Sequence, residues 1–264
     1  MKFIRIFFVL VLGCFSTLSA AYCPQLLSQR ALPTPTPLLQ IHFAEKDIPL
    51  SDREKKLIDH IKTSIRYSFF EVSAISPSIA YGIDGMASVK IRHLLNNLCS
   101  FQGTRYLEIG TWRGPTFIAA LYNNQGRVDY AVGIDDGSAY GGLDELENNL
   151  DQLLPRCSYP YEIYSQDCFK IPLITQFNSA INCYLYDGDH SVASQEKAFT
   201  YYDDILDDTF IVLLDDWNEE PVRQGTFNAF RKLNYEVLFE TWLPGPYTLW
   251  RNGFYIALIR KPIK

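Results

Sequence analysis

The feature that most restricts the fold is a regular alternation of short apolar runs and amphipathic segments from Arg105 onward. Its first unit is Arg105–Gly114, RYLEIGTWRG, where a strand pattern contains Glu108 and is followed by Gly110 and Gly114. Glycines at such a turn permit a tight backbone and the close approach of a ligand to backbone N–H groups. Four further strand–helix pairs follow. Five such units in a row predict an α/β fold with a doubly wound, mostly parallel sheet.

The two last predicted strands, Glu236–Trp242 and Gly253–Arg260, have no helix between them. The connection is short and contains proline and glycine, so these strands are expected to pair antiparallel. The sheet should therefore have seven strands with an antiparallel final pair. The five preceding strands are predicted at 105–109, 129–134, 161–165, 182–186 and 209–214, and their helices at 115–122, 143–153, just after 167, 193–205 and 222–233.

The N-terminal hundred residues divide into three predicted parts. Residues 1–21 have a basic end, a short apolar core and small residues at Ser19–Ala21, which is the pattern of an export signal. An uncleaved membrane anchor, or a lipoprotein acylated at Cys14, is the alternative. Residues 22–50 are proline-rich and are predicted to be a linker. Residues 51–100 should form a helical cap, with a capping box at Ser51 and Met86 packed in a second helix over 86–98, before a main domain at 101–264.

Composition narrows the classes of partner. The chain has 264 residues, 47% of them hydrophobic, and a net charge of −6. No basic surplus is available to neutralise phosphates, so a nucleic-acid partner is not expected. Contact with a membrane is expected only through the N-terminal hydrophobic segment, if it is uncleaved or lipidated. The six cysteines have irregular spacing, which does not indicate a disulfide framework or a structural zinc site.

A carboxylate lies at the end of each of the five parallel strands. Ligands bind outside the carboxyl ends of the strands in open α/β sheets. One such acid is explained by capping of the next helix, but five together repel one another unless cations or hydrogen-bond donors lie among them. The pattern therefore indicates a binding site. Its members are Glu108, Asp135, Asp167, Asp187 and Asp215.

With these motifs, residues 82–260 resemble the class I S-adenosylmethionine-dependent methyltransferases, whose fold is Rossmann-like. Glu108, Gly110 and Gly114 match the family's first motif, and the resemblance implies that this loop holds the methionine part of S-adenosyl-L-methionine. Asp135 matches the acid that accepts hydrogen bonds from the ribose hydroxyls, with Asp136 as the alternative if the register differs by one residue.

The resemblance further implies that Asp167 binds the adenine amino group, with Phe169 as a stacking neighbour. A helix cap is the other interpretation of Asp167.

A second acidic set resembles the metal-dependent O-methyltransferases of small molecules and sugars. The segments DGDH, from Asp187, and LDDW, around Asp215 and Asp216, match the positions at which those enzymes bind Mg²⁺. The resemblance implies that Asp187, Asp215 and Asp216 are the metal ligands. Oxygen ligands suit Mg²⁺ or a similar divalent cation.

His190 occupies the position of a lysine in the catechol-type enzymes. A histidine there is a candidate general base near neutral pH, acting with Asp187 in catalysis. Asp189 is the other candidate base.

Two hypotheses of function follow. The first is a methyltransferase that uses a divalent cation to O-methylate a hydroxyl of a small molecule or glycan. The second is an exported binding or interaction domain with a methyltransferase-like fold and no catalysis, because an exported protein has no obvious supply of the cofactor.

Overall fold

The computed structural model describes residues 43–45, 48–154, 158–173, 177, 180–245 and 247–263. The predicted export signal at 1–21 and most of the predicted linker lie outside these residues. Within the described part of the chain, no helix combines the length and the apolar character needed to span a bilayer.

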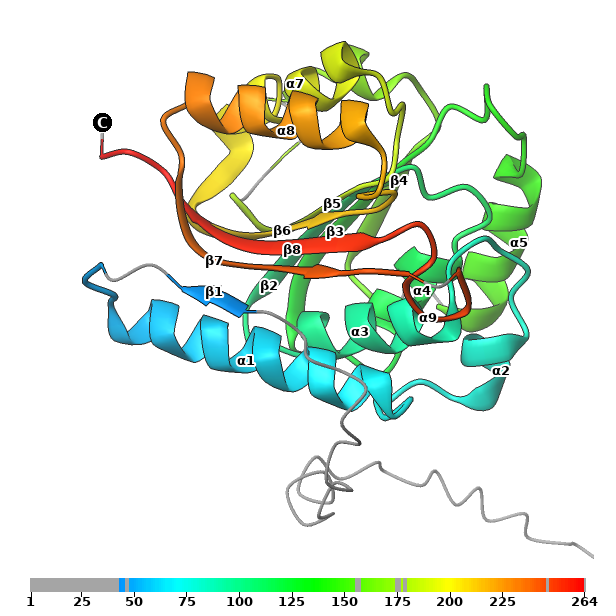
Figure 1. Cartoon of the computed structure of the whole chain (residues 1–264). Coiled ribbons are helices and arrows are strands. Elements are labelled where there is room, and N and C mark those ends of the chain that lie inside the picture. Colours follow the sequence, from blue (N-terminus) through cyan, green and yellow to red (C-terminus); the bar gives the residue numbers. More distant parts are fainter. Residues whose placement is uncertain are drawn as a thin grey trace, which may run out of the picture. The chain divides into compact units, whose positions relative to one another are not determined.

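A single eight-stranded sheet runs through the described chain (Figure 1). Its strands follow the order β1-β7-β8-β6-β5-β2-β3-β4, in which β4, β3, β2, β5 and β6 are parallel. β8 pairs antiparallel with both β6 and β7, so the predicted mostly parallel sheet with an antiparallel final pair is confirmed. The strands are β1 Phe43–Glu45, β2 Thr104–Ile109, β3 Val128–Ile134, β4 Tyr161–Tyr164, β5 Ile181–Tyr186, β6 Leu206–Leu214, β7 Glu236–Leu243 and β8 Phe254–Arg260.

The eighth strand, β1, lies in the stretch that the sequence indicated as linker. It pairs antiparallel with β7, from Phe43 opposite Thr241 to Glu45 opposite Phe239. The rings of Phe43 and Phe239 lie 5.7 Å apart. A strand of three residues carries almost no periodic signal of its own, because its stability comes from the partner strand.

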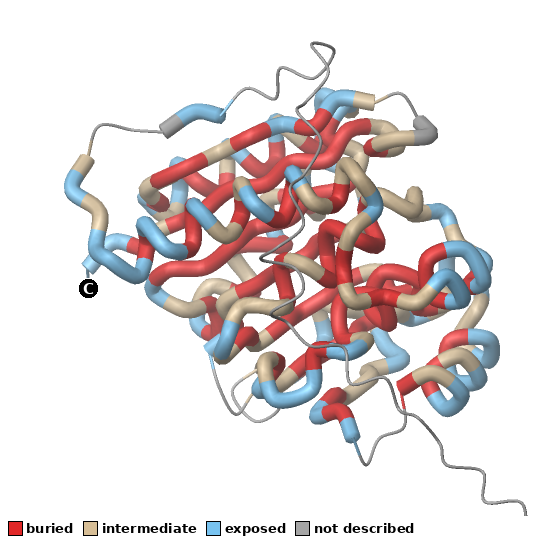
Figure 2. The backbone as a smooth tube through the Cα atoms, turned by 90° about the horizontal axis from the view of Figure 1, so that it is seen from below, coloured by how far each residue is buried: buried red, intermediate tan, exposed pale blue. Residues whose placement is uncertain are grey.

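Helices cover both faces of the sheet. One core lies between the sheet and the helices α1 (Asp52–Phe69), α3 (Val89–Cys99), α4 (Pro115–Leu121) and α5 (Leu143–Leu153). The other lies between the sheet and α7 (Val192–Thr200) and α8 (Glu220–Lys232). Figure 2 shows buried positions along the inner strands and exposed positions on the outer turns of the helices. The predicted doubly wound architecture is therefore present.

Several helix boundaries differ from the predicted ones. The capping box at Ser51 and Glu54 begins α1 as predicted. The predicted helix over 86–98 instead begins at Val89, because the Ser88 side chain caps it, and Met86 is 41% exposed rather than packed. The predicted helix over 193–205 ends at Thr200 and is followed by a separate 3₁₀ turn, η3 (Asp203–Ile205). Two further short helices lie in the described residues: α2 (Pro77–Tyr81) and, in the β7–β8 connection, α9 (Tyr247–Trp250).

The direction of the connections reverses between β2 and β5 at the centre of the sheet. β2 is followed outward by β3 and β4, and β5 is followed in the opposite direction by β6. At this point the backbone N–H of Asp187 donates to the carbonyl of Ile109 at 2.9 Å, and the N–H of Gly110 donates to Ile134 at 2.8 Å. Open α/β sheets bind ligands in the crevice at such a switch point. The glycine loop and the acid that follows β5 are therefore direct neighbours.

Candidate functional site

The glycine loop joins β2 to α4. Gly110 has φ +88° and Gly114, the N-cap of α4, has φ +86°, which are conformations that side chains disfavour. A Cβ at Gly110 would lie 2.0 Å from the carbonyl oxygen of Asp187. A Cβ at Gly114 would lie 2.7 Å from the Leu146 side chain. Gly110 is thus required by its close approach to the Asp187 backbone, and Gly114 is favoured by its left-handed conformation, because the end of the Leu146 side chain can move. Contact with a cofactor remains a prediction for both.

Glu108 lies beneath the glycine loop and has no exposed surface. Its carboxylate accepts hydrogen bonds from the hydroxyls of Tyr106 at 2.6 Å and Thr116 at 2.5 Å. Burial raises the pKa of Glu108 to about 7, although both hydrogen bonds oppose this. Because Thr116 belongs to α4, the carboxylate ties the start of that helix to β2. The predicted direct contact of Glu108 with a cofactor is not tested by this arrangement.

Asp135 follows β3 and organises two loops. Its Oδ2 accepts the N–H of Trp112 at 2.7 Å, and its Oδ1 accepts the N–H of Gly137 at 2.8 Å. Each carboxylate oxygen keeps a further lone pair, so two more donors can still bind. The alternative residue, Asp136, is exposed and accepts the N–H of Ser138 at 2.9 Å. Asp135 is therefore the better placed of the two for a ligand beside the glycine loop.

Asp167 caps a 3₁₀ turn, η2 (Cys168–Lys170). Its Oδ1 accepts the N–H of Phe169 at 2.9 Å, and its Oδ2 lies 3.1 Å from Nζ of Lys170. The backbone hydrogen bond and the lysine lower the pKa of Asp167. The ring of Phe169 packs edge-on against Tyr201 at 5.7 Å. The helix-cap interpretation of Asp167 is thus observed, and adenine binding remains a prediction.

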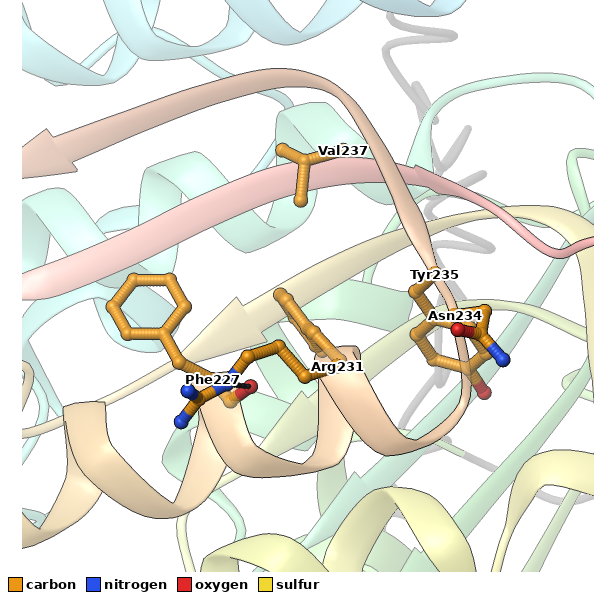
Figure 3. A pocket seen from close by; sticks show the side chains of 6 residues that line it. Phe227, Arg231, Asn234, Tyr235 and Val237 are labelled. Atoms are coloured by element: carbon orange, nitrogen blue, oxygen red, sulfur yellow. Dashed lines mark hydrogen bonds between the residues drawn. The ribbon is translucent and has the colours of Figure 1, made fainter.

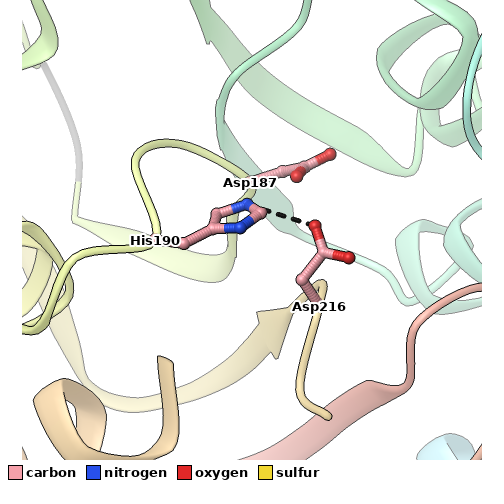
Figure 4. A group of neighbouring side chains, drawn as sticks. All are labelled: Asp187, His190 and Asp216. Carbon is pink, nitrogen blue, oxygen red and sulfur yellow. Dashed lines mark ion pairs between the residues drawn. The ribbon is translucent and has the colours of Figure 1, made fainter. Parts of the chain in front are cut away.

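Three side chains converge just past the ends of β5 and β6: Asp187, His190 and Asp216 (Figure 4). One ligand atom from each lies within 4.8 Å of the others. Asp216 has φ +52°, in the left-handed region, and this turn of the backbone directs its side chain toward His190. Two carboxylates and an imidazole at this separation are a possible donor set for a divalent cation.

His190 lies between two carboxylates. Its Nε2 is 3.1 Å from Oδ2 of Asp216, and its Nδ1 is 3.1 Å from Oε2 of Glu219. The hydrogen bond with Asp216 raises the pKa of His190 to about 9, which exceeds the opposing effect of burial. The predicted role as general base therefore requires that His190 first lose its proton. Asp189, the other candidate base, is exposed and accepts the N–H of Ser191 at 2.9 Å.

Repulsion between neighbouring carboxylates contributes to raised pKa values among the acids in this cluster. Burial, followed by the charges of Asp215 and Asp216, raises the pKa of Asp187 well above its usual value. Burial and the charge of Asp216 raise the pKa of Asp215 to about 7. Burial, the largest single effect, acts to raise the pKa of Asp216, but the hydrogen bond and charge of His190, with Asn252 and Arg251, together outweigh it and the pKa is lowered. The predicted repulsion among the carboxylates is thus present, and His190, together with Arg251 and Asn252, offsets part of it.

The converging set differs from the predicted metal ligands at one position. Asp215 is buried, and its Oδ1 accepts the N–H of Asp216 at 2.9 Å. It is not among the residues whose ligand atoms gather, and His190 takes its place. The backbone turn after β6 explains the difference, because adjacent residues in a turn direct their side chains to different sides.

Two residues of the site were not predicted from the sequence. Glu219 precedes α8 and holds Nδ1 of His190, and Nδ2 of Asn252 donates to Oε1 of Glu219 at 3.2 Å. Glu219 lies among acids at the start of a helix, where a cap is the ordinary interpretation. Asn252 lies in the β7–β8 connection, and nothing in the sequence relates it to His190. Only the folded chain brings these residues together.

A surface hollow lies away from the acidic site. It has a volume of about 600 Å³ and is formed by the C-terminal end of α8 and the start of β7 (Figure 3). Glu219 and the acid cluster are at the opposite, N-terminal end of α8. The hollow is open and is not part of the acidic site. Its lining residues are Phe227, Phe230, Arg231, Asn234, Tyr235 and Val237.

Comparisons with known proteins identify the fold class. No protein-family model and no curated protein sequence matches the chain. Among solved structures, a proposed O-methyltransferase from Klebsiella pneumoniae matches 81% of this chain and 92% of its own, with 13% identity and a TM-score of 0.51. A proposed caffeoyl-CoA O-methyltransferase from Staphylococcus aureus matches 79% of this chain and 99% of its own, with 13% identity and a TM-score of 0.50. The chain therefore has the fold of the class I S-adenosylmethionine-dependent methyltransferases.

Proposed function

We propose that the protein is an S-adenosyl-L-methionine-dependent methyltransferase that O-methylates a hydroxyl of a small molecule or glycan with the help of a divalent cation. The observation that carries this proposal is the convergence of Asp187, His190 and Asp216 beside Gly110 at the switch point of a methyltransferase-type sheet. A structural role alone does not account for carboxylates that repel one another at the position where such sheets bind ligands.

The residues of the glycine loop suit the cofactor. Asp135 has acceptor capacity left for the two ribose hydroxyls, because each of its oxygens receives one backbone N–H. In the loop itself, Oγ1 of Thr111 and Nε1 of Trp112 are buried without a hydrogen-bond partner among the described residues. Buried polar atoms of native proteins normally have partners. A bound ligand with polar groups would supply them.

The acidic cluster suits a cation. The Asp187 carboxylate has no hydrogen bond or ion pair within the described residues, and its raised pKa comes from burial and neighbouring acids. A bound divalent cation lowers the pKa of a hydroxyl that it coordinates and orients that hydroxyl. Asp187 and Asp216 would hold the cation, and Asp215 as a further ligand remains a prediction.

The chain's own groups would then have distinct tasks. The glycine loop would position the methyl donor at the end of β2, which the contact of Gly110 with Asp187 places beside the acids. Such positioning of two reactants is a large part of the rate that an enzyme supplies. His190, once deprotonated, could accept the proton of the acceptor hydroxyl at Nε2. The exposed ring of Tyr140 packs edge-on against Trp112 at 6.3 Å and would form part of the acceptor wall.

Two measurements on the purified protein test this function. Isothermal titration calorimetry with S-adenosylhomocysteine should detect binding, and methyl transfer from radiolabelled S-adenosylmethionine to a panel of hydroxylated acceptors should stop when a chelator is added. Asp187→Asn should retain S-adenosylhomocysteine binding and lose cation-dependent transfer. Glu220→Gln is a control because its side chain is 75% exposed and forms a surface ion pair with Arg223, away from the cluster. Absence of S-adenosylhomocysteine binding, or turnover that survives both chelator and Asp187→Asn, would contradict the proposal.

A further inference from the structure

The donor set that the fold brings together contains a nitrogen atom. Asp187 and Asp216 contribute carboxylate oxygens, and His190 contributes Nε2, with all three atoms within 4.8 Å of one another. The carboxylate of Asp215, by contrast, is engaged in the turn after β6 through the N–H of Asp216. The observed set therefore has two oxygens and one imidazole, rather than the three carboxylates predicted from the sequence.

The ring nitrogen of His190 that faces away from Asp216, Nδ1, also has a carboxylate partner. Nδ1 lies 3.1 Å from Oε2 of Glu219, and the other oxygen of Glu219 accepts the side-chain N–H of Asn252 at 3.2 Å. If Nδ1 carries a proton toward Glu219, Nε2 is left with its lone pair toward Asp216 and Asp187. Histidines that ligate metals commonly donate their second ring N–H to a carboxylate, which fixes the tautomer and the ring orientation.

Asp187 supplies the independent sign that a ligand is needed. Its carboxylate has no hydrogen-bond or ion-pair partner among the described residues, although it lies at the end of the central strand β5. The carboxylate is partly buried beside other acids, and a charge removed from water in this way is stabilised by a partner. The carboxylate oxygen of Asp187 and the Nε2 of His190 are close enough to share one ion.

We propose that Asp187, His190 through Nε2, and Asp216 ligate one divalent cation, that Glu219 orients His190 from Nδ1, and that the site prefers a late first-row metal ion to Mg²⁺. This inference rests on the proposed function for the existence of a cation and changes its ligands and its kind. Imidazole nitrogen suits cobalt, zinc, iron and nickel ions, whereas Mg²⁺ favours oxygen ligands and retained water. His190 is then a ligand, and the general base must be another group.

The test uses the chelator-treated, untagged full-length protein. Isothermal titration with CoCl₂ and with MgCl₂ should give at least about tenfold tighter binding of Co²⁺. Bound Co²⁺ should show a visible ligand-field absorption band. His190→Gln should lose this preference and alter the band. Glu219→Gln should weaken Co²⁺ binding by about 10- to 100-fold, because it removes the carboxylate that orients the ligand.

Two further variants make the result specific. Asp215→Asn retains the oxygen that accepts the N–H of Asp216 and should leave Co²⁺ affinity within a few-fold of the parent protein. Glu220→Gln, next to Glu219 but exposed, should have no effect. Thermal unfolding of each variant without metal shows whether it is folded before its affinity is interpreted.

Several outcomes would overturn the inference: Mg²⁺ binding as tightly as Co²⁺, His190→Gln without effect on affinity, Asp215→Asn abolishing binding, or no cation binding at all. S-adenosylhomocysteine is titrated into the same samples. If it binds while the cation results fail, the ligand set proposed here is wrong and the methyl-donor site stands. If Co²⁺ binds as expected while S-adenosylhomocysteine does not, the cation site is supported and the methyltransferase proposal fails.

Discussion

Replacement of Gly110 by alanine should separate the glycine loop from the acid cluster. The added Cβ would lie 2.0 Å from the carbonyl oxygen of Asp187 and 2.8 Å from its carbonyl carbon. Real Cβ atoms essentially never approach another heavy atom closer than 3.0 Å. The nearest atom therefore has to move by about 1 Å (3.0 − 2.0). Because it belongs to the backbone at the end of β5, no side-chain rotation can relieve the contact.

The loss of stability has two parts. A non-glycine residue at φ +88° costs roughly 1–2 kcal/mol, since its Cβ crowds the following carbonyl. Overpacking against backbone adds about 1–3 kcal/mol. Gly110→Ala should thus lower the free energy of unfolding by about 2–5 kcal/mol. A displacement of 1 Å between the loop and Asp187 should also reduce methyl transfer by about 100-fold, because reacting groups tolerate little misplacement.

Gly126→Ala is the control that separates the conformational cost from the cost of the close contact. Gly126 has φ +73°, and a Cβ at this position would meet nothing within 4 Å. This variant therefore carries the conformational cost without the contact. Urea unfolding followed by far-UV circular dichroism should show that Gly110→Ala loses at least about 1 kcal/mol more than Gly126→Ala. Calorimetry with S-adenosylhomocysteine should show weaker binding for Gly110→Ala alone.

Equal losses of stability in the two variants would refute this reasoning, because the contact with Asp187 would then contribute nothing. Unchanged methyl transfer by Gly110→Ala would likewise show that the loop and the acid cluster do not act together.

Three other predictions concern the scaffold and the cluster. The hydrogen bond from Arg260 lowers the pKa of Glu54 from 4.5 to about 2, so the stability that this carboxylate contributes is complete above pH 4.5 and is lost as the pH falls from there toward 2. The contribution to the free energy of unfolding is at most about 3 kcal/mol. Urea titrations at a series of pH values should show that Glu54→Gln loses this part of the acid dependence. Glu236→Gln, at the more exposed partner of Arg260, should lose less of it. Asp187→Asn should stabilise the cation-free protein at pH 7 by on the order of 1 kcal/mol, since it removes a carboxylate that burial and neighbouring acids disfavour; a lower melting temperature would contradict this. Asn96→Ala should cost about 2–4 kcal/mol, because this fully buried amide bonds three backbone groups that would be left without partners, and a loss below 1 kcal/mol would show that water replaces it.

The local patterns of the sequence were sufficient for most of the fold. Apolar runs followed by acids or glycine predicted all five parallel strands, and the absence of a helix between the last two predicted their antiparallel pairing. The capping box at Ser51 predicted the start of α1. These features depend on residues that are close in the chain, so their physical basis can be identified without knowledge of distant partners.

One element that was not predicted depends on a partner that is distant in the sequence. β1 exists because the edge of β7 offers it hydrogen bonds, and its three residues have no periodic pattern strong enough to predict it. The start of α3 was misplaced for a local reason: the helix was predicted from Met86, whereas the Ser88 side chain caps it and it begins at Val89.

The sequence by itself determined which strand ends carry acids, and therefore where the candidate site lies. It did not determine which of those acids meet. That depends on the backbone turn after β6, where Asp216 at φ +52° faces His190 while Asp215 is engaged within the turn. Glu219 reaches His190, and Asn252 reaches Glu219, only because α8 and the β7–β8 connection fold together beside the site. Side-chain direction at a turn is set by backbone angles and tertiary packing, which is why the tertiary structure, and not the spacing of acids in the chain, decides the donor set.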